Sequence, residues 1–289
     1  MRITPEIVSQ NLLTALNNTE QRLATLQEEA ATGRAFQVPS DHPGRVAQSL
    51  SLTNSLALVQ QYQAAGQSAT SQLNAADAAL AEVQQLMIQM QSTAVQGANA
   101  TQTSTDEAAL IKTVNAAITG IQGIANTQFN GGYLFAGTNN QTAPLNTATG
   151  TWSGNNAAIT FQIGSNTTVA VNVDGATLFP RLLADLRSLS AALASGSTQV
   201  QSMIPVLQND LTQVSNVRAA VGARLDLVNQ QASQLTTLSS TLQQNLSTTE
   251  GANMANVATL LAQEEQAYQA ALQSGAQILP LSLLSFLKP

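Results

Sequence analysis

An apolar side chain recurs at alternating steps of four and three residues from Val200 to Leu246, and this stripe restricts the possible fold more than any other feature. Twelve of its fourteen positions are apolar, although hydrophobic residues make up 44% of the chain. A mean spacing of about 3.5 residues is typical of a coiled-coil seam. Burying each large side chain contributes about 1.5–3 kcal/mol, so a second helix must cover the stripe. Pro205 should kink this helix or mark its true start. The predicted rod core seam comprises Leu207, Leu211, Val214, Val221, Leu225, Val228, Leu235, Leu242 and Leu246.

Residues 5–32 predict another helix with the same spacing. Its seam comprises Leu12, Leu16, Thr19, Leu23, Leu26 and Ala30. Gly33 can adopt the left-handed conformation that ends many helices. The two prolines within residues 34–43 exclude a continuous helix through that connector.

The last segment, residues 251–289, combines a helical apolar stripe with an apolar end, and a soluble protein rarely leaves such an end in water. It either docks on its own domain or binds a partner, which is the other end of the chain or another copy. The matching stripe in residues 5–32, together with the absence of a catalytic site and the family resemblance of the ending described below, favours an assembly role. The predicted assembly interface comprises Leu12, Leu16, Leu23, Leu26, Val257, Leu261, Tyr268, Leu272, Leu279, Leu284 and Leu287.

Three further helices are predicted between these ends from their apolar spacing. The first covers residues 43–95. Ser104, with Glu107 three residues later, forms a capping box that begins the second, which covers residues 104–126. The third covers residues 182–196.

The period of the pattern changes to two in the middle of the chain. Apolar residues alternate with polar ones over residues 159–163 and again over residues 169–173. The intervening Gly-Ser-Asn-Thr at 164–167 predicts a β-hairpin. Residues 133–137 predict another short strand.

Together these patterns predict a mainly α fold: a long antiparallel helical rod or coiled coil, with paired N- and C-terminal helices and a small β-hairpin region in the middle. Residues 1–38 and 251–289 would form one inner terminal-helix domain. Residues 39–132 and 181–250 would form the two halves of a helical rod domain, and residues 133–180 the β region.

The composition argues against several kinds of partner. Charged residues make up 9% of the chain, its net charge is −6, and its ten basic residues are scattered, so nucleic-acid binding is not expected. No apolar run approaches the roughly 18 residues of a membrane span, so membrane insertion is not expected either. The N-terminal segment lacks the apolar stretch of a cleavable secretory signal.

The sequence offers little to build a catalytic or metal site. His42 is the single histidine and there is no cysteine, which excludes histidine clusters, thiolate chemistry and cysteine-bound zinc. No serine lies in a GxSxG motif, and no Walker loop or GxGxxG motif is present. We therefore expect no enzymatic activity, no cofactor and no bound metal.

Arg218 interrupts the apolar seam. Its aliphatic part could pack while the guanidinium reaches water. Alternatively it pairs with a carboxylate, such as Asp210, Asp226 or one from another helix, and fixes the register of the helices.

Several segments resemble bacterial flagellins and their hook-associated relatives. On the N-terminal side these are LATLQEEAATGR at 23–34, PSDHP at 39–43, AVQGAN at 94–99, FNG at 129–131 and LFAG at 134–137. On the C-terminal side they are VRAAVGAR at 217–224 and QILPLSLLSFL at 277–287. Together they bracket almost the whole chain in the family's order.

Within that family, the opening MRIT, the PSDHP connector, the YLFAG segment and the small β region resemble the subunit of the hook–filament junction more than flagellin. His42 departs from the pattern, which commonly has a second Asp there. The resemblance implies an extracellular structural subunit of the bacterial flagellum, exported unfolded through the flagellar type III apparatus. It implies a ring of about one helical turn of subunits, seated on the first hook-associated protein and supporting flagellin.

The resemblance also implies an export chaperone that holds the C-terminal segment. Two other functions stay open at this point. One is a flagellin that polymerises into the filament, and the other is an unrelated secreted helical binding protein.

Overall fold

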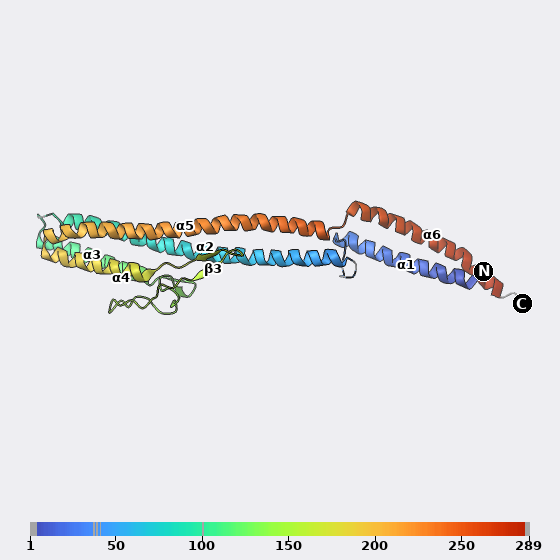
Figure 1. Cartoon of the computed structure of the whole chain (residues 1–289), viewed down its shortest axis with the longest axis horizontal. Helices are drawn as coiled ribbons and strands as arrows, with labels where there is room; N and C mark the ends of the chain where they lie inside the picture. The colour runs from blue at the N-terminus through green and yellow to red at the C-terminus, as the bar shows by residue number, and fades with distance from the viewer. Residues whose placement is uncertain (1–4, 37, 39, 41, 100, 287–289) are drawn as a thin grey trace. The chain divides into compact units, whose positions relative to one another are not determined.

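The computed structural model describes residues 5–36, 38, 40, 42–99 and 101–286; for residues 5, 6, 8 and 277–286 it describes the backbone without side chains. The elements follow in the order α1 (Pro5–Thr32), α2 (Pro43–Gly97), α3 (Ser104–Ala125), β1 (Gln128–Phe129), β2 (Gly132–Tyr133), β3 (Thr160–Gln162), β4 (Thr168–Ala170), α4 (Gly175–Ser195), α5 (Ser197–Glu250) and α6 (Met254–Phe286) (Figure 1). The predicted mainly α fold with a small β region is confirmed.

The chain forms two compact units, residues 1–57 with 239–289, and residues 58–238. Each unit includes part of α2 and part of α5. The finer division into a terminal-helix domain, a rod and a β region stays a prediction.

In the first unit, α1 packs along α6. The two helices are antiparallel, because Leu12 approaches Gly275 while Arg22 pairs with Glu264 at 3.3 Å. Gly33 ends α1 with a φ of 67°, the left-handed conformation expected from the sequence. The predicted pairing of the N- and C-terminal helices is therefore confirmed.

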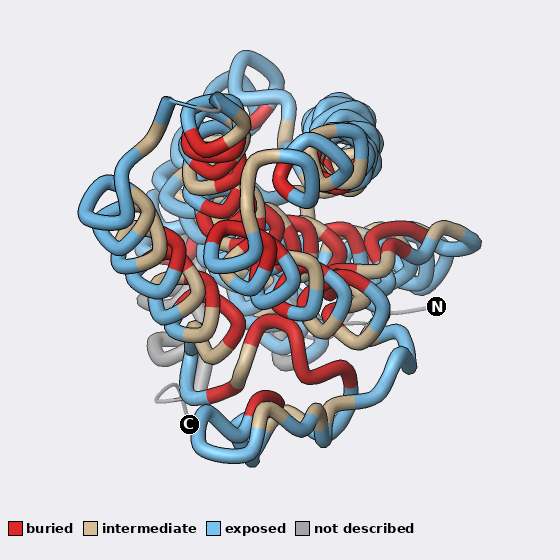
Figure 2. Tube along the Cα trace, turned by 90° about the vertical axis from the view of Figure 1, so that its left-hand side faces the viewer, coloured by how far each residue is buried: buried red, intermediate tan, exposed pale blue. Residues whose placement is uncertain are grey.

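In the second unit, α2 and α5 run antiparallel, since Arg218 pairs with Asp77 and Val228 lies beside Gly66. The α3 and α4 helices pack against each other and complete the core. Buried residues lie on one side of each helix (Figure 2). The largest fully buried side chains include Leu73, Leu80, Met87, Met90, Ile121, Phe135, Phe179, Leu182, Leu183 and Leu186.

The α3 helix is long and apolar enough, by length and composition alone, to cross a membrane. Its apolar face is occupied by the core, where Val114, Ala117, Ile121, Ile124 and Ala125 are buried. Its hydropathy is thus accounted for by packing against α4 and its neighbours.

The β region consists of two hairpins. The predicted hairpin is confirmed by antiparallel β3 and β4, in which Phe161 faces Val169. The strand predicted over residues 133–137 is shorter, because only Gly132–Tyr133 pairs, with Gln128–Phe129. Asn130 and Gly131 form the two-residue turn between β1 and β2, both with positive φ, a conformation that Asn-Gly favours.

The α4 helix begins earlier than the predicted residue 182. Asp174 caps it by accepting hydrogen bonds from the backbone N–H groups of Ala176 and Thr177, so the helix starts at Gly175. A Cβ at Gly175 would lie 2.6 Å from the Phe135 carbonyl oxygen and 2.7 Å from the Trp152 ring. Glycine therefore lets the β region close over the start of α4.

One other local prediction is wrong, and one is narrowed to a single alternative. The capping box of α3 uses Thr103 and Asp106, one residue before the predicted Ser104 and Glu107. Both sites offer an acceptor and an acidic residue at the required spacing, and the chain uses the earlier one. Pro205 does not mark the start of α5, because the helix begins at Ser197 and contains Pro205, so the alternative of a kink at Pro205 stays a prediction.

Candidate functional site

The predicted terminal stripes face each other along the α1–α6 pair. Val257 is buried, as is Thr19 in the opposing stripe. The stripe residues that are half-buried are Leu12, Leu16, Leu23, Leu26, Leu261 and Tyr268. A pair of helices covers only one side of each stripe, so much of this apolar surface stays accessible in the single subunit.

Leu272 lies outside the α1–α6 contact and is 48% exposed. The step of four and three continues from Tyr268 through Ala271, which is half-buried, to Gly275, which is buried. A Cβ at Gly275 would lie 3.0 Å from a Leu12 methyl group, so the small residue lets the helices approach. Side chains of Leu279 and Leu284, and all of Leu287, lie outside the described residues.

Short backbone and side-chain contacts join the connectors at the ends of α1 and α5. The Ala35 N–H donates to the Glu250 carbonyl at 2.7 Å, and the Ala252 N–H donates to the Gly33 carbonyl at 2.9 Å. The Glu250 carboxylate accepts from the Ser49 hydroxyl and the Arg34 guanidinium. These bonds, first that from Ser49, lower the pKa of Glu250 below its ordinary value.

The predicted rod core seam lies on the inner side of α5. Its buried members are Leu207, Val214, Val221, Val228 and Leu235. Its half-buried members are Leu211, Leu225, Leu242 and Leu246.

Arg218 resolves the alternatives left open by the sequence, because it pairs with a carboxylate from another helix. Its guanidinium donates to both oxygens of Asp77, at 2.9 and 3.0 Å, and to the Gln84 side-chain oxygen at 2.6 Å. The hydrogen bond to Asp77 raises the pKa of Arg218. The pair links α2 to α5 in a bidentate geometry.

Asp210 faces α4, where neither of its buried carboxylate oxygens has a hydrogen-bond partner among the described residues. The Arg181 Nε lies 3.2 Å from Asp210 Oδ1 and 3.7 Å from Asp185 Oδ2, so one guanidinium serves two carboxylates. Burial, followed by repulsion from Asp185, raises the pKa of Asp210 to about 6.

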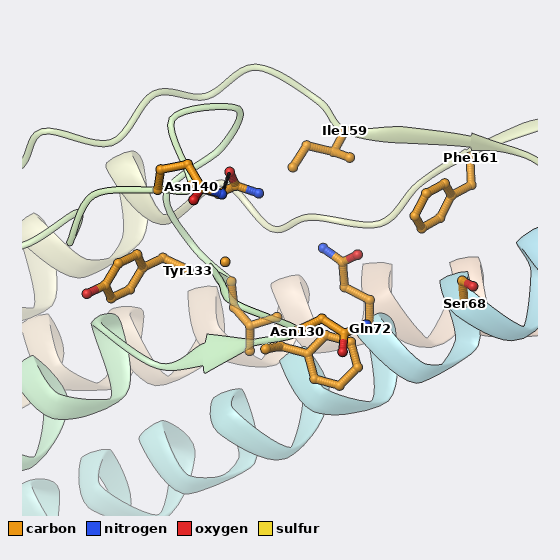
Figure 3. Close-up of a pocket in the computed structure, with 11 residues that line it drawn as sticks. Ser68, Gln72, Asn130, Tyr133, Asn140, Ile159 and Phe161 are labelled. Carbon is orange, nitrogen blue, oxygen red and sulfur yellow. Dashed lines mark hydrogen bonds between the residues drawn. The ribbon is translucent and has the colours of Figure 1, made fainter.

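A cavity of about 250 Å³ lies in the second unit between α2, the β1–β2 hairpin and β3 (Figure 3). The Gln72 side chain points up from α2 into this space, and Ile159 and Phe161 point down from the opposite side. The lining residues are Ser68, Gln72, Phe129, Asn130, Gly132, Tyr133, Leu134, Asn140, Gln141, Ile159 and Phe161.

The sequence did not predict this cavity, because its residues come from four separate segments. The turn at Asn130 and Gly131, an Asn-Gly pair, was the one local signal that could have located its wall. Within the described part of the chain, no three His, Asp or Glu residues gather closely enough to hold a metal ion.

Residues 3–140 match the N-terminal helical region of bacterial flagellin. The flagellar hook-associated protein 3 of Salmonella typhimurium is 28% identical over 180 residues, which span 62% of this chain and 57% of that protein. The flagellar hook-associated protein 3 of Escherichia coli is 24% identical over 233 residues, or 79% of this chain and 74% of that protein.

The resemblance to the bacterial flagellin family is confirmed. The crystal structure of Bacillus cereus FlgL shares the fold, with a TM-score of 0.62 at 18% identity, over 68% of this chain and 99% of that one. The flagellin-like N-terminal region covers α1, α2, α3 and the β1–β2 hairpin. It therefore includes one wall of the cavity and one partner of each helix pair.

Proposed function

We propose that this protein is a structural subunit of the bacterial flagellum that forms the junction ring between hook and filament. The relatives named flagellar hook-associated protein 3 support the flagellar, hook-associated role. The ring would contain about one helical turn of subunits, lie on the first hook-associated protein and support flagellin above it.

The observation that carries this proposal is the antiparallel pair of helices from the two ends of the chain. Its seam is only half covered, and Leu13, Leu260 and Leu272 are exposed on the described part of the pair at 57%, 38% and 48%. Apolar side chains at such exposure in a charge-poor chain favour burial against another subunit. This arrangement suits a protein that completes its packing on assembly.

Leu13 and Leu272 lie on the same side of the pair. Each directly follows a seam residue, Leu12 and Ala271 respectively. In an antiparallel pair, residues one step after the seam turn toward the same side, because the opposite chain directions reverse the sense of rotation. We take this side as the subunit contact, together with the open edges of the seam residues.

Export and location follow from the same proposal. The subunit would leave the cell through the flagellar type III apparatus and act outside it. A dedicated chaperone would hold the C-terminal segment before export and keep its apolar stripe from aggregating.

Deletion of the gene tests the junction role. Cells without it should assemble hooks and secrete flagellin that does not polymerise on them, as seen by electron microscopy and by flagellin in the medium. Normal filaments in the deletion strain would exclude the junction role. Long filaments grown from seeded, purified protein would instead identify a flagellin.

Leu272→Asp tests the assembly surface. We expect the variant to keep the helix content and melting temperature of the wild type, because Leu272 is half exposed, but to fail to restore filaments in the deletion strain. Gln273→Asp, an exposed neighbour with the same added charge, is the control and should restore them. A Leu272→Asp variant that restores filaments would place the subunit contact elsewhere.

A further inference from the structure

The cavity in the second unit has an unusual lining for this chain. The protein has ten aromatic residues, from one Trp, three Tyr and six Phe. Three of them, Phe129, Tyr133 and Phe161, line this one cavity. Four side-chain amides accompany them, from Gln72, Asn130, Asn140 and Gln141, and no lining residue is charged.

Hydrogen-bonding groups are free at this site. The amides of Gln72 and Asn130 make no hydrogen bond to any residue in the described part of the chain. Gln72 is half-buried, and its amide points into the space below Ile159 and Phe161 (Figure 3). A half-buried amide that is bonded only to water can exchange that water for a ligand at little cost.

The walls of the cavity hold their positions through backbone contacts. The Tyr133 N–H donates to the Asn140 carbonyl at 2.9 Å, which fixes the loop that follows the hairpin. A Cβ at Gly132 would lie 2.9 Å from the Asn140 side-chain nitrogen, so glycine lets that side chain close over the hairpin. These contacts fix the hairpin and the loop that form two walls of the cavity.

The sequence on either side of the lining residues carries no charge either. No Asp, Glu, Lys or Arg occurs over residues 113–173 or over residues 46–76, the two stretches that supply all of its lining. An anion or a cation would find no opposite charge among the lining residues, and a purely apolar ligand would leave the amides unpaired. The lining fits a neutral ligand with many hydroxyl groups and one apolar face.

We propose that this cavity binds one ring of a neutral saccharide. The ring's C–H face would pack on the Phe161 and Phe129 rings, and its hydroxyls would bond to the Gln72 and Asn130 amides. A volume of about 250 Å³ far exceeds the roughly 30 Å³ of one water and lies just below the roughly 300–1,000 Å³ of drug-sized sites. It admits a single sugar ring, and the open rim leaves room for the rest of a glycan.

The proposal is tested on the full-length protein by saturation-transfer NMR with glucose, galactose, mannose and N-acetylglucosamine. Methyl glycosides of the same sugars distinguish a ring attached to a glycan from a free sugar, and glucuronate serves as the charged control. We expect one neutral sugar to bind with a Kd of about 1–10 mM, since few groups hold it, and glucuronate to bind at least tenfold more weakly.

Gln72→Ala should weaken binding of that sugar about tenfold, and Phe161→Ala about fivefold. Gln67→Ala, an exposed amide on the same helix outside the cavity, is the matched control and should leave the Kd unchanged. Circular dichroism and Trp152 fluorescence show whether each variant keeps its fold.

Absence of binding by every neutral sugar up to 100 mM, a roughly tenfold margin over the expected Kd, would overturn the proposal. So would binding that Gln72→Ala does not weaken in a folded variant, or binding of an uncharged dipeptide amide in preference to the sugars. None of these results bears on the junction role, which the gene deletion tests separately.

Discussion

Replacing Asp210 by Asn should stabilise the second unit at neutral pH. The Asp210 side chain is fully inaccessible to water, and neither oxygen accepts a hydrogen bond in the described residues. Its ion-pair partner, Arg181, is 46% exposed and also pairs with Asp185. A neutral amide of the same shape avoids the cost of burying this charge and can donate to the Asp185 carboxylate.

The pKa of Asp210 sets the size of the effect. A rise from 3.8 to about 6 corresponds to about 3 kcal/mol, at about 1.4 kcal/mol per pKa unit. Because the folded-state pKa lies above the unfolded value, the carboxyl favours folding most below pH 3.8. That contribution is lost as the pH rises through about 6. At pH 8 we therefore expect the free energy of unfolding of Asp210→Asn to be about 1–3 kcal/mol larger than that of the wild type. Near pH 4 the two free energies should differ little.

Urea unfolding from pH 4 to pH 8.5, followed by Trp152 fluorescence, measures this difference. Trp152 belongs to the second unit and stacks on Phe179 of α4 at 5.8 Å between ring centroids, so its signal reports the packing of α4. Asp226→Asn, the same substitution at an exposed carboxylate on the same helix, is the control and should raise the free energy of unfolding at pH 8 less than Asp210→Asn does.

A free-energy difference between Asp210→Asn and wild type that does not change with pH would refute the reasoning. So would a variant less stable than the wild type at pH 8. Either result would mean that Arg181 compensates the buried charge fully, and that Asp210 is ionised throughout this range.

Three further outcomes follow from single contacts. Asp77→Asn should lower the free energy of unfolding in urea by about 1 kcal/mol, because Arg218 loses a bidentate but partly exposed partner. A double-mutant cycle with Arg218→Gln should give a coupling energy of similar size. Glu250→Gln should cost about 1 kcal/mol at pH 7 and progressively less as the pH falls below 4.5. The carboxylate's contribution is present above its ordinary pKa of 4.5 and is lost as the pH falls. Gly33→Ala should cost about 1 kcal/mol in thermal unfolding, because alanine is strained at a φ of 67° even though no atom blocks its Cβ.

The helices and their pairing were predictable because they depend on periodicity. In the stripe of α5, apolar spacing alone identified residues that the structure buries from Val200 to Leu235. The predicted seam of α5 nevertheless includes only part of its contact surface in the second unit. Asp210 pairs with Arg181 of α4, and Arg224 donates to the Asn172 carbonyl, so polar residues beside the seam also make contacts. A pattern that counts apolar residues does not detect them.

In the C-terminal stripe, the sequence-based prediction included a residue that does not lie in the seam. The sequence assigned Leu272 to the seam because it is large and apolar, yet Ala271 and Gly275 occupy it. Small residues let two helices approach closely, as the contact of Gly275 with Leu12 shows. Hydrophobicity scales give such residues low values, so a search for large apolar residues does not select them. The cavity beside Gln72 could not be predicted from the sequence for a different reason, because only the folded chain brings its four segments together.

In a chain with so few charges, the ion pair between Arg218 and Asp77 helps to determine the register of α5 along α2. A slip of α5 along α2 by one heptad would still place apolar positions opposite apolar positions. It would also set Arg218 against Gln84 or Thr70, and Asp77 against Leu211 or Leu225. A partly exposed pair adds about 1 kcal/mol at most to the correct arrangement, and the slipped register loses this contribution and leaves both charges without an opposite partner. A single Arg–Asp contact therefore favours one alignment of these amide-rich helices.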